Sequence, residues 1–240
     1  MSALPARTAL IVGASSPLGV ALGAALAEDG WAVSPCGRDP ARLPVGALLC
    51  DLARPEQVRD LADRLRTRPP DLLLWAASCF EPAPYRRAAA EEALAVGALA
   101  AFEVGLAHLE GAAAAGRAVT QVHLADLAGA EPLLTAPAYS LAAGAARVGV
   151  RWLQRRAPAG CSVVVVRPGL VDVPGRERPV EVAVAARDTV LGRRARLDEV
   201  VTAVREVLGR PAAFHGAVLD VDGGLALRPP SRRPLPDPGE

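Results

Sequence analysis

The chain alternates short apolar runs with longer helical segments over most of its length. Residues 9–12, 71–75 and 162–166 are runs of strand length in which all residues but the first of the second and third runs are apolar. The last of them is a serine followed by four valines, as expected for a strand buried on both faces of a sheet. Strands that alternate with helices form βαβ units. The sequence therefore predicts an α/β fold with a doubly wound parallel sheet and helices on both faces.

The predicted elements follow one another with short connections. The strands are expected at residues 9–12, 32–34, 47–50, 71–75, 118–124, 162–166 and 217–221. The helices are expected at residues 19–28, 55–67, 88–115, 137–156 and 197–208. We expect residues 1–227 to form one domain, because a chain of this length commonly forms a single α/β unit. Residues 228–240 hold five prolines and no apolar period, which predicts a disordered tail.

The composition excludes several classes of function. The net charge is +1 with both signs well mixed, so no basic face for nucleic acid is predicted. The apolar stretch 93–102 is too short to span a bilayer, and the N-terminus lacks the pattern of a signal peptide. The four cysteines show no CxxC pairing and no histidine at metal-ligand spacing. These features predict a reduced, cytoplasmic protein without a metal site or a membrane partner.

A glycine-rich turn joins the first predicted strand to the first predicted helix. It reads Gly13-Ala14-Ser15-Ser16-Pro17-Leu18-Gly19. Backbone N–H groups in such a turn, including those of Ser15 and Ser16, can bind a pyrophosphate at the positive end of a helix. Gly13 permits the tight turn and Gly19 permits close contact between helix and strand. The turn predicts a Rossmann-type dinucleotide site.

Two charged residues follow the next two strands. Arg38 ends the second strand, where an arginine can bind a 2′-phosphate. Asp51, followed by Leu52, ends the third strand, where a carboxylate can accept from an adenine amine. Taken alone, Arg38 is equally well explained as a solvated turn residue and Asp51 as a helix cap. Together and in register, they favour NADP(H) over NAD(H).

Further segments resemble the short-chain dehydrogenase/reductase family over about residues 8–224. The matching segments, in family order, are Leu48 to Leu52, Arg167-Pro168-Gly169, Leu191-Gly192-Arg193, Asp198-Glu199-Val200 and Gly216 to Gly224. The resemblance implies that Ala76, after the fourth strand, and Pro168 and Gly169 border the cofactor. Pro17 replaces a glycine that the family usually has, and it cannot donate a hydrogen bond to a phosphate.

The resemblance also implies a proton relay of Ser, Tyr, Lys and Asn, and this chain departs from it. Tyr139 matches the family tyrosine, whereas Ala143 stands at the lysine position and Asp126 at the serine position. The asparagine position falls near Gly97. The 240 residues contain no lysine and no asparagine at all. A tyrosine without a neighbouring cation keeps a pKa near 10 and is a poor base.

Other side chains could take over part of the relay. Asp126 could act as a general base or, if desolvated, as a proton donor. His123 lies on the strand before Asp126 and could join it, although a core or surface histidine is the more ordinary interpretation. Arg147, one turn beyond Ala143, could bind a ribose or phosphate but is too basic to shuttle protons.

Three functions remain open at this point. The first is an enzyme of secondary-metabolite, polyketide-like biosynthesis that performs non-redox cyclisation, dehydration or isomerisation with Asp126 and Tyr139. The second is an NADPH-dependent ketoreductase with an atypical relay. The third is a non-catalytic subunit that pairs with an active relative. A small-molecule substrate and a homodimer or homotetramer are expected. Residues 174–190 are expected to form either a lid over the substrate or a solvated, mobile loop, and the loop is the more ordinary interpretation.

Overall fold

The computed structural model describes residues 6–173, 182, 184 and 187–227. Seven strands form one parallel sheet in the order β3-β2-β1-β4-β5-β6-β9. They are β1 (Thr8–Val12), β2 (Ala32–Gly37), β3 (Leu48–Leu49), β4 (Leu72–Trp75), β5 (Thr120–Leu124), β6 (Ser162–Pro168) and β9 (Val218–Val221). The short strands β7 (Val171–Asp172) and β8 (Ala195–Arg196) pair separately. The predicted doubly wound α/β fold is confirmed.

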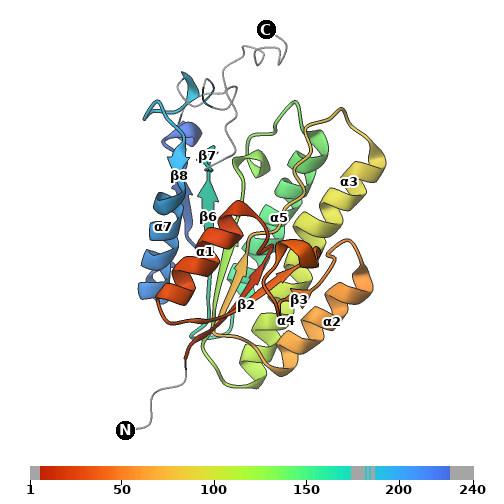
Figure 1. The fold of residues 1–240 in the computed structure, drawn as a ribbon, viewed down its shortest axis with the longest axis vertical. Coiled ribbons are helices and arrows are strands. Elements are labelled where there is room, and N and C mark those ends of the chain that lie inside the picture. The colour runs from red at the N-terminus through yellow and green to blue at the C-terminus, as the bar shows by residue number, and fades with distance from the viewer. Residues whose placement is uncertain (1–5, 174–181, 183, 185–186, 228–240) are drawn as a thin grey trace.

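Helices cover both faces of the sheet. They are α1 (Pro17–Glu28), α2 (Pro55–Thr67), α3 (Arg87–Leu94), α4 (Ala100–Ala114), α5 (Pro137–Arg156) and α7 (Leu197–Gly209). Figure 1 shows α1 and α7 together on the left, and α2, α3, α4 and α5 on the right. Buried side chains of α1 and α7 share one core cluster with strand residues such as Ile11 and Val164, whereas α2 and α4 pack on the opposite face against Leu10 and Leu73.

Strands β2 and β3 are added on one side of β1, and β4 and the later strands are added on the other side, so the order switches between β1 and β4. In an open parallel sheet, the carboxyl ends of the strands meet at one edge, and ligands bind where the order switches. The turns after β1, β2, β4, β5 and β6 all meet at this edge. The loops that carry the predicted cofactor and catalytic residues are therefore brought together by the topology.

Several element boundaries differ from the prediction. Helix α1 begins at Pro17 rather than residue 19, because Ser16 caps it and proline is compatible with the first helical position. Strand β2 continues through Pro35 to Gly37, paired on both sides with β1 and β3. Strand β6 runs to Pro168, two residues beyond the predicted end, because β9 pairs with it there.

The long predicted helix at 88–115 contains an irregular turn. One π-helical segment, Ala95–Leu99, separates α3 from α4. Such segments insert an extra residue into a helix and often occur at functional sites. This one contains Gly97, where the family resemblance places the relay asparagine.

This helical run also corrects the length argument against a membrane span. Arg87–Ala114 has 28 residues and a mean hydropathy of 1.5, so by length and composition it could cross a bilayer. Half of its most apolar window is buried inside the fold, however. It packs against α2, α5 and the sheet as a core helix, which accounts for its hydropathy.

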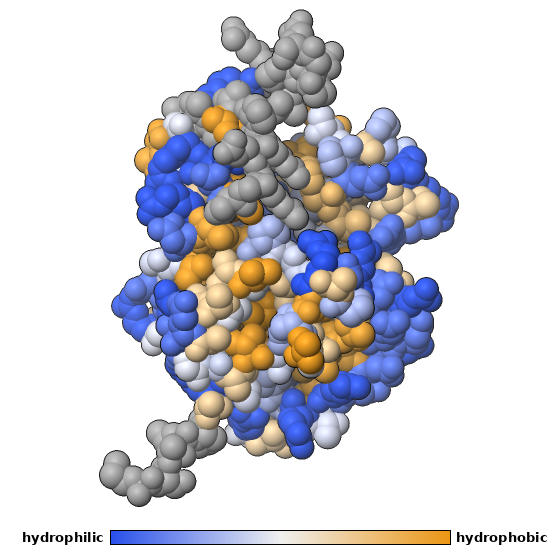
Figure 2. All heavy atoms as spheres, in the orientation of Figure 1, coloured by the Kyte–Doolittle hydropathy of each residue, from blue (hydrophilic) through white to orange (hydrophobic). Residues whose placement is uncertain are grey.

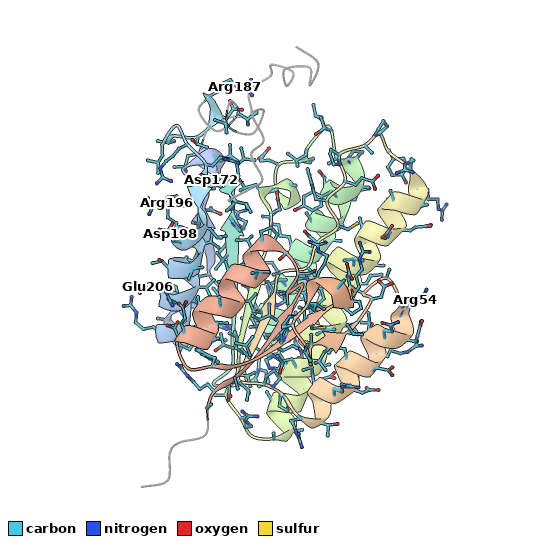
Figure 3. All side chains as sticks on the ribbon, in the orientation of Figure 1. Arg54, Asp172, Arg187, Arg196, Asp198 and Glu206 are labelled. Atoms are coloured by element: carbon cyan, nitrogen blue, oxygen red, sulfur yellow. The ribbon has the colours of Figure 1, made fainter. Side chains whose placement is uncertain are left out.

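The surface shows where apolar and charged side chains gather. In Figure 2, apolar side chains lie in the middle of the face that carries α1, between hydrophilic surfaces over α7 and over α2. The charged side chains labelled in Figure 3 lie on the outside, with Arg54 before α2 and Glu206 on α7. Arg196 and Asp198 form an ion pair at 2.9 Å at the start of α7. The predicted tail at 228–240 and most of the predicted lid lie outside the described residues.

Candidate active site

The turn after β1 has the close packing that a dinucleotide-binding turn requires. Gly13 has a φ of +85°, and a Cβ at this position would lie 2.5 Å from the backbone nitrogen of Ala77. A Cβ on Gly19 would lie 2.4 Å from the carbonyl oxygen of Gly13. A larger residue at Gly13 would push the turn away from the loop after β4, and one at Gly19 would push α1 away from the turn. Both predicted glycines are thus required by the local geometry.

The N–H groups of this turn divide into two sets. Those of Gly13 and Ala14 donate to the carbonyl oxygen of Cys36, and that of Gly19 donates to the Ser16 hydroxyl oxygen at 3.0 Å. The N–H of Ser16, expected from the sequence to bind a phosphate, instead donates to the carbonyl oxygen of Gly13 at 3.0 Å and closes the turn. Within the described part of the chain, the N–H groups of Ser15 and Leu18 have no hydrogen-bond partner. Both lie at the positive end of the 12-residue helix α1.

These two free N–H groups suit a nucleotide phosphate. Pro17, between them, removes one donor, but it does not distort the helix that provides the positive end. The turn therefore fits a dinucleotide cofactor, with fewer backbone donors than a glycine at position 17 would allow.

An arginine that the sequence analysis missed contacts the turn directly. Arg42 donates from Nη2 to the carbonyl oxygen of Ser15 at 3.2 Å. Arg38, the predicted 2′-phosphate ligand, lies beside Glu92 of α3 at 4.0 Å with its side chain largely exposed. Both arginines follow β2, so two cations are available on this side of the turn. The spacing Arg38-Asp39-Pro40-Ala41-Arg42, a short 3₁₀ turn capped by Asp39, was the available signal.

The other predicted cofactor residues lie around the same edge. Asp51 is half-buried and accepts from the backbone N–H of Ala53 at 3.1 Å, so it closes a local turn rather than capping α2. Leu52 packs against the core cluster beneath α2. The Ala76 carbonyl accepts from the Ser16 hydroxyl at 3.4 Å, which ties the loop after β4 to the phosphate turn.

The segment after β6 is held against the last strand. Pro168 is buried at the end of β6, and the N–H of Gly169 donates to the carbonyl oxygen of Val221 at 3.1 Å. A Cβ on Gly169 would lie 2.7 Å from that of Asp222. This segment is fixed in place beside the carboxyl end of β5.

Tyr139 and Asp126 form a direct pair. The Tyr139 hydroxyl donates to Oδ2 of Asp126 at 2.8 Å, and Oδ1 of Asp126 accepts from the N–H of Ala128 at 2.7 Å. Asp126 caps the 3₁₀ turn Leu127–Gly129, and Tyr139 lies in the first turn of α5. The Phe80 ring contacts the Tyr139 ring edge-on, with centroids 5.0 Å apart, which the sequence analysis did not anticipate.

The surroundings of Tyr139 favour its neutral form. Burial raises the pKa of Tyr139, and the negative charge of Asp126 and the hydrogen bond to it raise the pKa further. Ala143, one turn later on α5, is a methyl group that brings no charge to this environment. Tyr139 is therefore a phenol that retains its proton far above neutral pH.

The side chains of Ser140, Arg147 and His123 have different surroundings. The hydroxyl of Ser140 is engaged in two hydrogen bonds to nearby backbone. Its oxygen accepts from the N–H of Leu133 at 2.9 Å, and its hydroxyl donates to the carbonyl oxygen of Ala136 at 3.0 Å. Arg147 is exposed at the cavity described below. His123 contacts neither Asp126 nor Tyr139 through a hydrogen bond; its Nε2 is paired with Oε1 of Gln121 at 3.0 Å. It belongs instead to a buried polar chain in the core.

A cavity of about 220 Å³ connects these groups. Tyr139, Asp126 and Ser78 line it, as do His123 and Trp75 from the middle of the sheet. It extends under α5 to Arg147. Among the described residues, no group of three histidine, cysteine or acidic side chains is arranged to hold a metal ion. The site thus offers a phenol, a carboxylate, the side chains of Arg147, Arg151 and Arg167, and a mostly apolar space.

Comparisons with known proteins agree with the fold. No protein-family model matches the chain. An 86-residue stretch is 40% identical to a Streptomyces sp. (strain C5) protein provisionally named daunorubicin C-13 ketoreductase, and it spans 30% of each chain. A structure described as a short chain dehydrogenase/reductase family protein is 25% identical, with a TM-score of 0.75, over 94% of this chain and 100% of that one.

Two further structures share the fold at lower identity. Gluconate 5-dehydrogenase from Burkholderia cenocepacia J2315, in complex with NADP and tartrate, has a TM-score of 0.82 at 23% identity and covers 94% of this chain and 97% of its own. 4-Hydroxyisoleucine dehydrogenase complexed with NADH has a TM-score of 0.83 at 17% identity, over 93% of this chain and 100% of its own. The sheet order, the phosphate turn and these matches show that the chain has the fold of the short-chain dehydrogenase/reductases.

Proposed function

We propose that this protein is an NADP(H)-dependent ketoreductase in which Asp126 and Tyr139 replace the usual proton relay. The observation that carries the proposal is the 2.8 Å hydrogen bond between them at the carboxyl end of β5. The cavity that they line adjoins the loop after β4, which is tied to the phosphate turn. A proton donor and a nucleotide turn at one sheet edge are what carbonyl reduction needs.

Residues that follow three strands would hold the cofactor. The N–H groups of Ser15 and Leu18 would bind the pyrophosphate, and Arg38 and Arg42 would bind the 2′-phosphate that distinguishes NADP(H). The carboxylate of Asp51 would accept from the adenine amine. When bound, the nicotinamide supplies a hydride to the carbonyl carbon.

Tyr139 and Asp126 would supply the proton that the carbonyl oxygen needs. As negative charge develops on the carbonyl oxygen, Tyr139 donates its phenolic proton to that oxygen, and the product is an alcohol. Asp126, held by the Ala128 N–H, orients the phenol and exchanges protons with solvent to restore it. Because its raised pKa keeps Tyr139 protonated near neutral pH, almost no phenolate is present to accept a proton from an alcohol, so the pair favours reduction of a ketone over oxidation of an alcohol.

The name of the Streptomyces protein supports a ketone as the first substrate class to test. The matched stretch covers 30% of that protein, so the likeness concerns only part of it. A ketone on a secondary metabolite is compatible with a cavity lined by apolar side chains around one phenol and one carboxylate. The substrate itself is part of the proposal.

NADPH consumption with a panel of aromatic and aliphatic ketones tests the function. We expect turnover by the wild type and a loss of about a hundredfold or more in kcat for Tyr139→Phe and for Asp126→Asn. Asp60→Asn, on an exposed part of α2, is the matched control and should keep full activity. Equal activity of all four proteins would contradict the proposed roles.

A non-redox reaction is the second candidate. It is favoured by Ala143, which stands where the family resemblance places a lysine. In such a reaction the phenol and carboxylate would move a proton between two positions of the substrate without a hydride. Product that forms at the same rate without NADPH would establish this candidate and exclude ketone reduction.

A further inference from the structure

The cavity beside Tyr139 extends deep under α5, away from the loops that would hold a nucleotide. Small side chains create it. Helices α3, α4 and α5 present Ala93, Ala101, Ala142 and Ala146 to this space, and Val150 and Val165 line its inner part. Larger residues at these positions would fill it. Its volume of about 220 Å³ therefore arises from the alanines on three helices.

A chain of buried hydrogen bonds ends at this cavity. His108 donates from Nε2 to the carbonyl oxygen of Pro70 at 2.8 Å, so its Nδ1 is an acceptor. The Gln121 amide nitrogen donates to that Nδ1 at 3.2 Å and to the carbonyl oxygen of Gly105 at 2.6 Å. The Gln121 oxygen must then accept from Nε2 of His123, at 3.0 Å.

This chain determines the tautomer of His123. Its proton is on Nε2, so Nδ1 carries a lone pair and can only accept a hydrogen bond. The side chain is 2% exposed, and Nδ1 has no hydrogen-bond partner among the described residues. Burial, followed by the nearby His108, lowers the pKa of His123 to about 4, so the ring is neutral at physiological pH. An unsatisfied, buried acceptor therefore belongs to a side chain that lines this mostly apolar cavity.

We propose that this cavity binds a small, mainly apolar ring compound whose hydroxyl or N–H group donates a hydrogen bond to Nδ1 of His123. The apolar lining stabilises the ring by burial, and the lone pair selects a donor. Leaving a buried polar group unpaired costs about 1–3 kcal/mol, so a ligand that satisfies Nδ1 is preferred over one that does not. His123 is the specificity-determining residue of this site.

The size of the space agrees with a single ring. An apolar protein cavity of roughly 150 Å³ binds benzene, so about 220 Å³ accommodates a substituted six-membered ring. Because Tyr139 and Asp126 line the same space, the bound ring would form the apolar part of the substrate if the proposed function holds. Binding of a ring compound requires no reaction. Failure of the binding test can therefore be distinguished from failure of the proposed enzymatic activity.

Phenol and toluene are matched probes, since they differ mainly in a hydroxyl that can donate and a methyl that cannot. Isothermal titration of the full chain should show that phenol binds at least as tightly as toluene. In a purely apolar cavity, phenol would bind about tenfold more weakly, because its hydroxyl would be left unpaired. Saturation with phenol should also shift the ¹⁵N resonance of Nδ1 of His123, while Nδ1 of His108, already paired with Gln121, should shift little.

Two variants locate the site. His123→Phe removes the acceptor and should weaken phenol binding by about tenfold or more while toluene binding changes little. Ala146→Leu fills the cavity and should abolish binding of both probes, whereas Ala145→Leu, on the exposed side of the same helical turn, should not. The Ala146 variant answers the question even if His123→Phe does not fold.

Three results would overturn the proposal. The first is no binding of either probe to the wild type. The second is a clear preference of the wild type for toluene, which would mean that Nδ1 accepts no hydrogen bond from the ligand. The third is equal loss of binding in the Ala145 and Ala146 variants, which would place the probes outside the cavity.

Discussion

The phenolic hydroxyl of Tyr139 donates a 2.8 Å hydrogen bond to Oδ2 of Asp126, thirteen residues earlier in the chain. The other oxygen of Asp126 is held by the N–H of Ala128. The carboxylate therefore has a defined orientation and presents its charge to the phenol. A neighbouring lysine lowers the pKa of a tyrosine, whereas burial and Asp126 raise the pKa of Tyr139.

Ionisation of Tyr139 should be shifted above the usual range. Burial and the charge of Asp126 raise the pKa of Tyr139, so the folded protein should form no phenolate there when the pH passes 10. The measurement is absorbance at 295 nm for the wild type minus Tyr139→Phe, from pH 7 to 11. In the unfolded chain the same tyrosine ionises near pH 10, so the native state should lose stability as the pH rises above that value. Phenolate from Tyr139 below pH 9 would contradict the assigned environment.

A lysine at position 143 should change the preferred direction of reaction. Ala143→Lys places an ammonium one helical turn after Tyr139, where it lowers the tyrosine pKa. Under the proposed function, the rate of alcohol oxidation with NADP⁺ at pH 7 should rise by about tenfold or more. Ala145→Lys adds the same charge on the exposed face of α5 and should have no effect. An equal gain in both variants would point to a general effect of charge.

Arg42 should contribute to the discrimination of NADPH from NADH. It contacts the Ser15 carbonyl at 3.2 Å, within the turn that would hold the pyrophosphate. Arg42→Ala and Arg38→Ala should each raise the Kd for NADPH by about tenfold and leave the Kd for NADH nearly unchanged, because only NADPH carries the 2′-phosphate. Fluorescence titration measures both constants, with Arg59→Ala on α2 as the control. Loss of affinity for both nucleotides alike would assign these arginines to the shared pyrophosphate.

Stability should fall in mild acid because two histidines are buried in the neutral form. Burial lowers the pKa of both His108 and His123 to about 4. Between pH 6.5 and 4 the unfolded chain binds protons that the folded chain does not, so the free energy of unfolding should decrease as the pH falls through this window. The loss is at most roughly 3 kcal/mol for each histidine. Urea unfolding at pH 7.5, 6 and 5 measures it, and the slope should diminish in His108→Gln. A stability that is constant across this range would show that the ring nitrogens are accessible to water.

Much of the candidate site could be read from local spacing. The alternation of strands and helices indicates the parallel sheet, and a parallel sheet brings the loops with Gly13, Asp126 and Tyr139 to one edge. The resemblance to a known family assigned Asp126 and Tyr139 to the serine and tyrosine positions of the relay. In the structure, these two side chains are joined by a hydrogen bond. The conclusion that Asp126 and Ala143 perform altered roles remains a prediction.

By itself, the sequence determined the fold class and the absence of a lysine beside Tyr139, because both depend only on residue type and order. Only the tertiary structure decided that Arg42 contacts the phosphate turn, and that His123 faces a cavity rather than joining Asp126. These contacts join segments far apart in the chain, so they depend on strand register, helix orientation and rotamer, which local periodicity does not specify. The cavity under α5 is likewise a property of three helices together, since alanines leave space only where their helices meet.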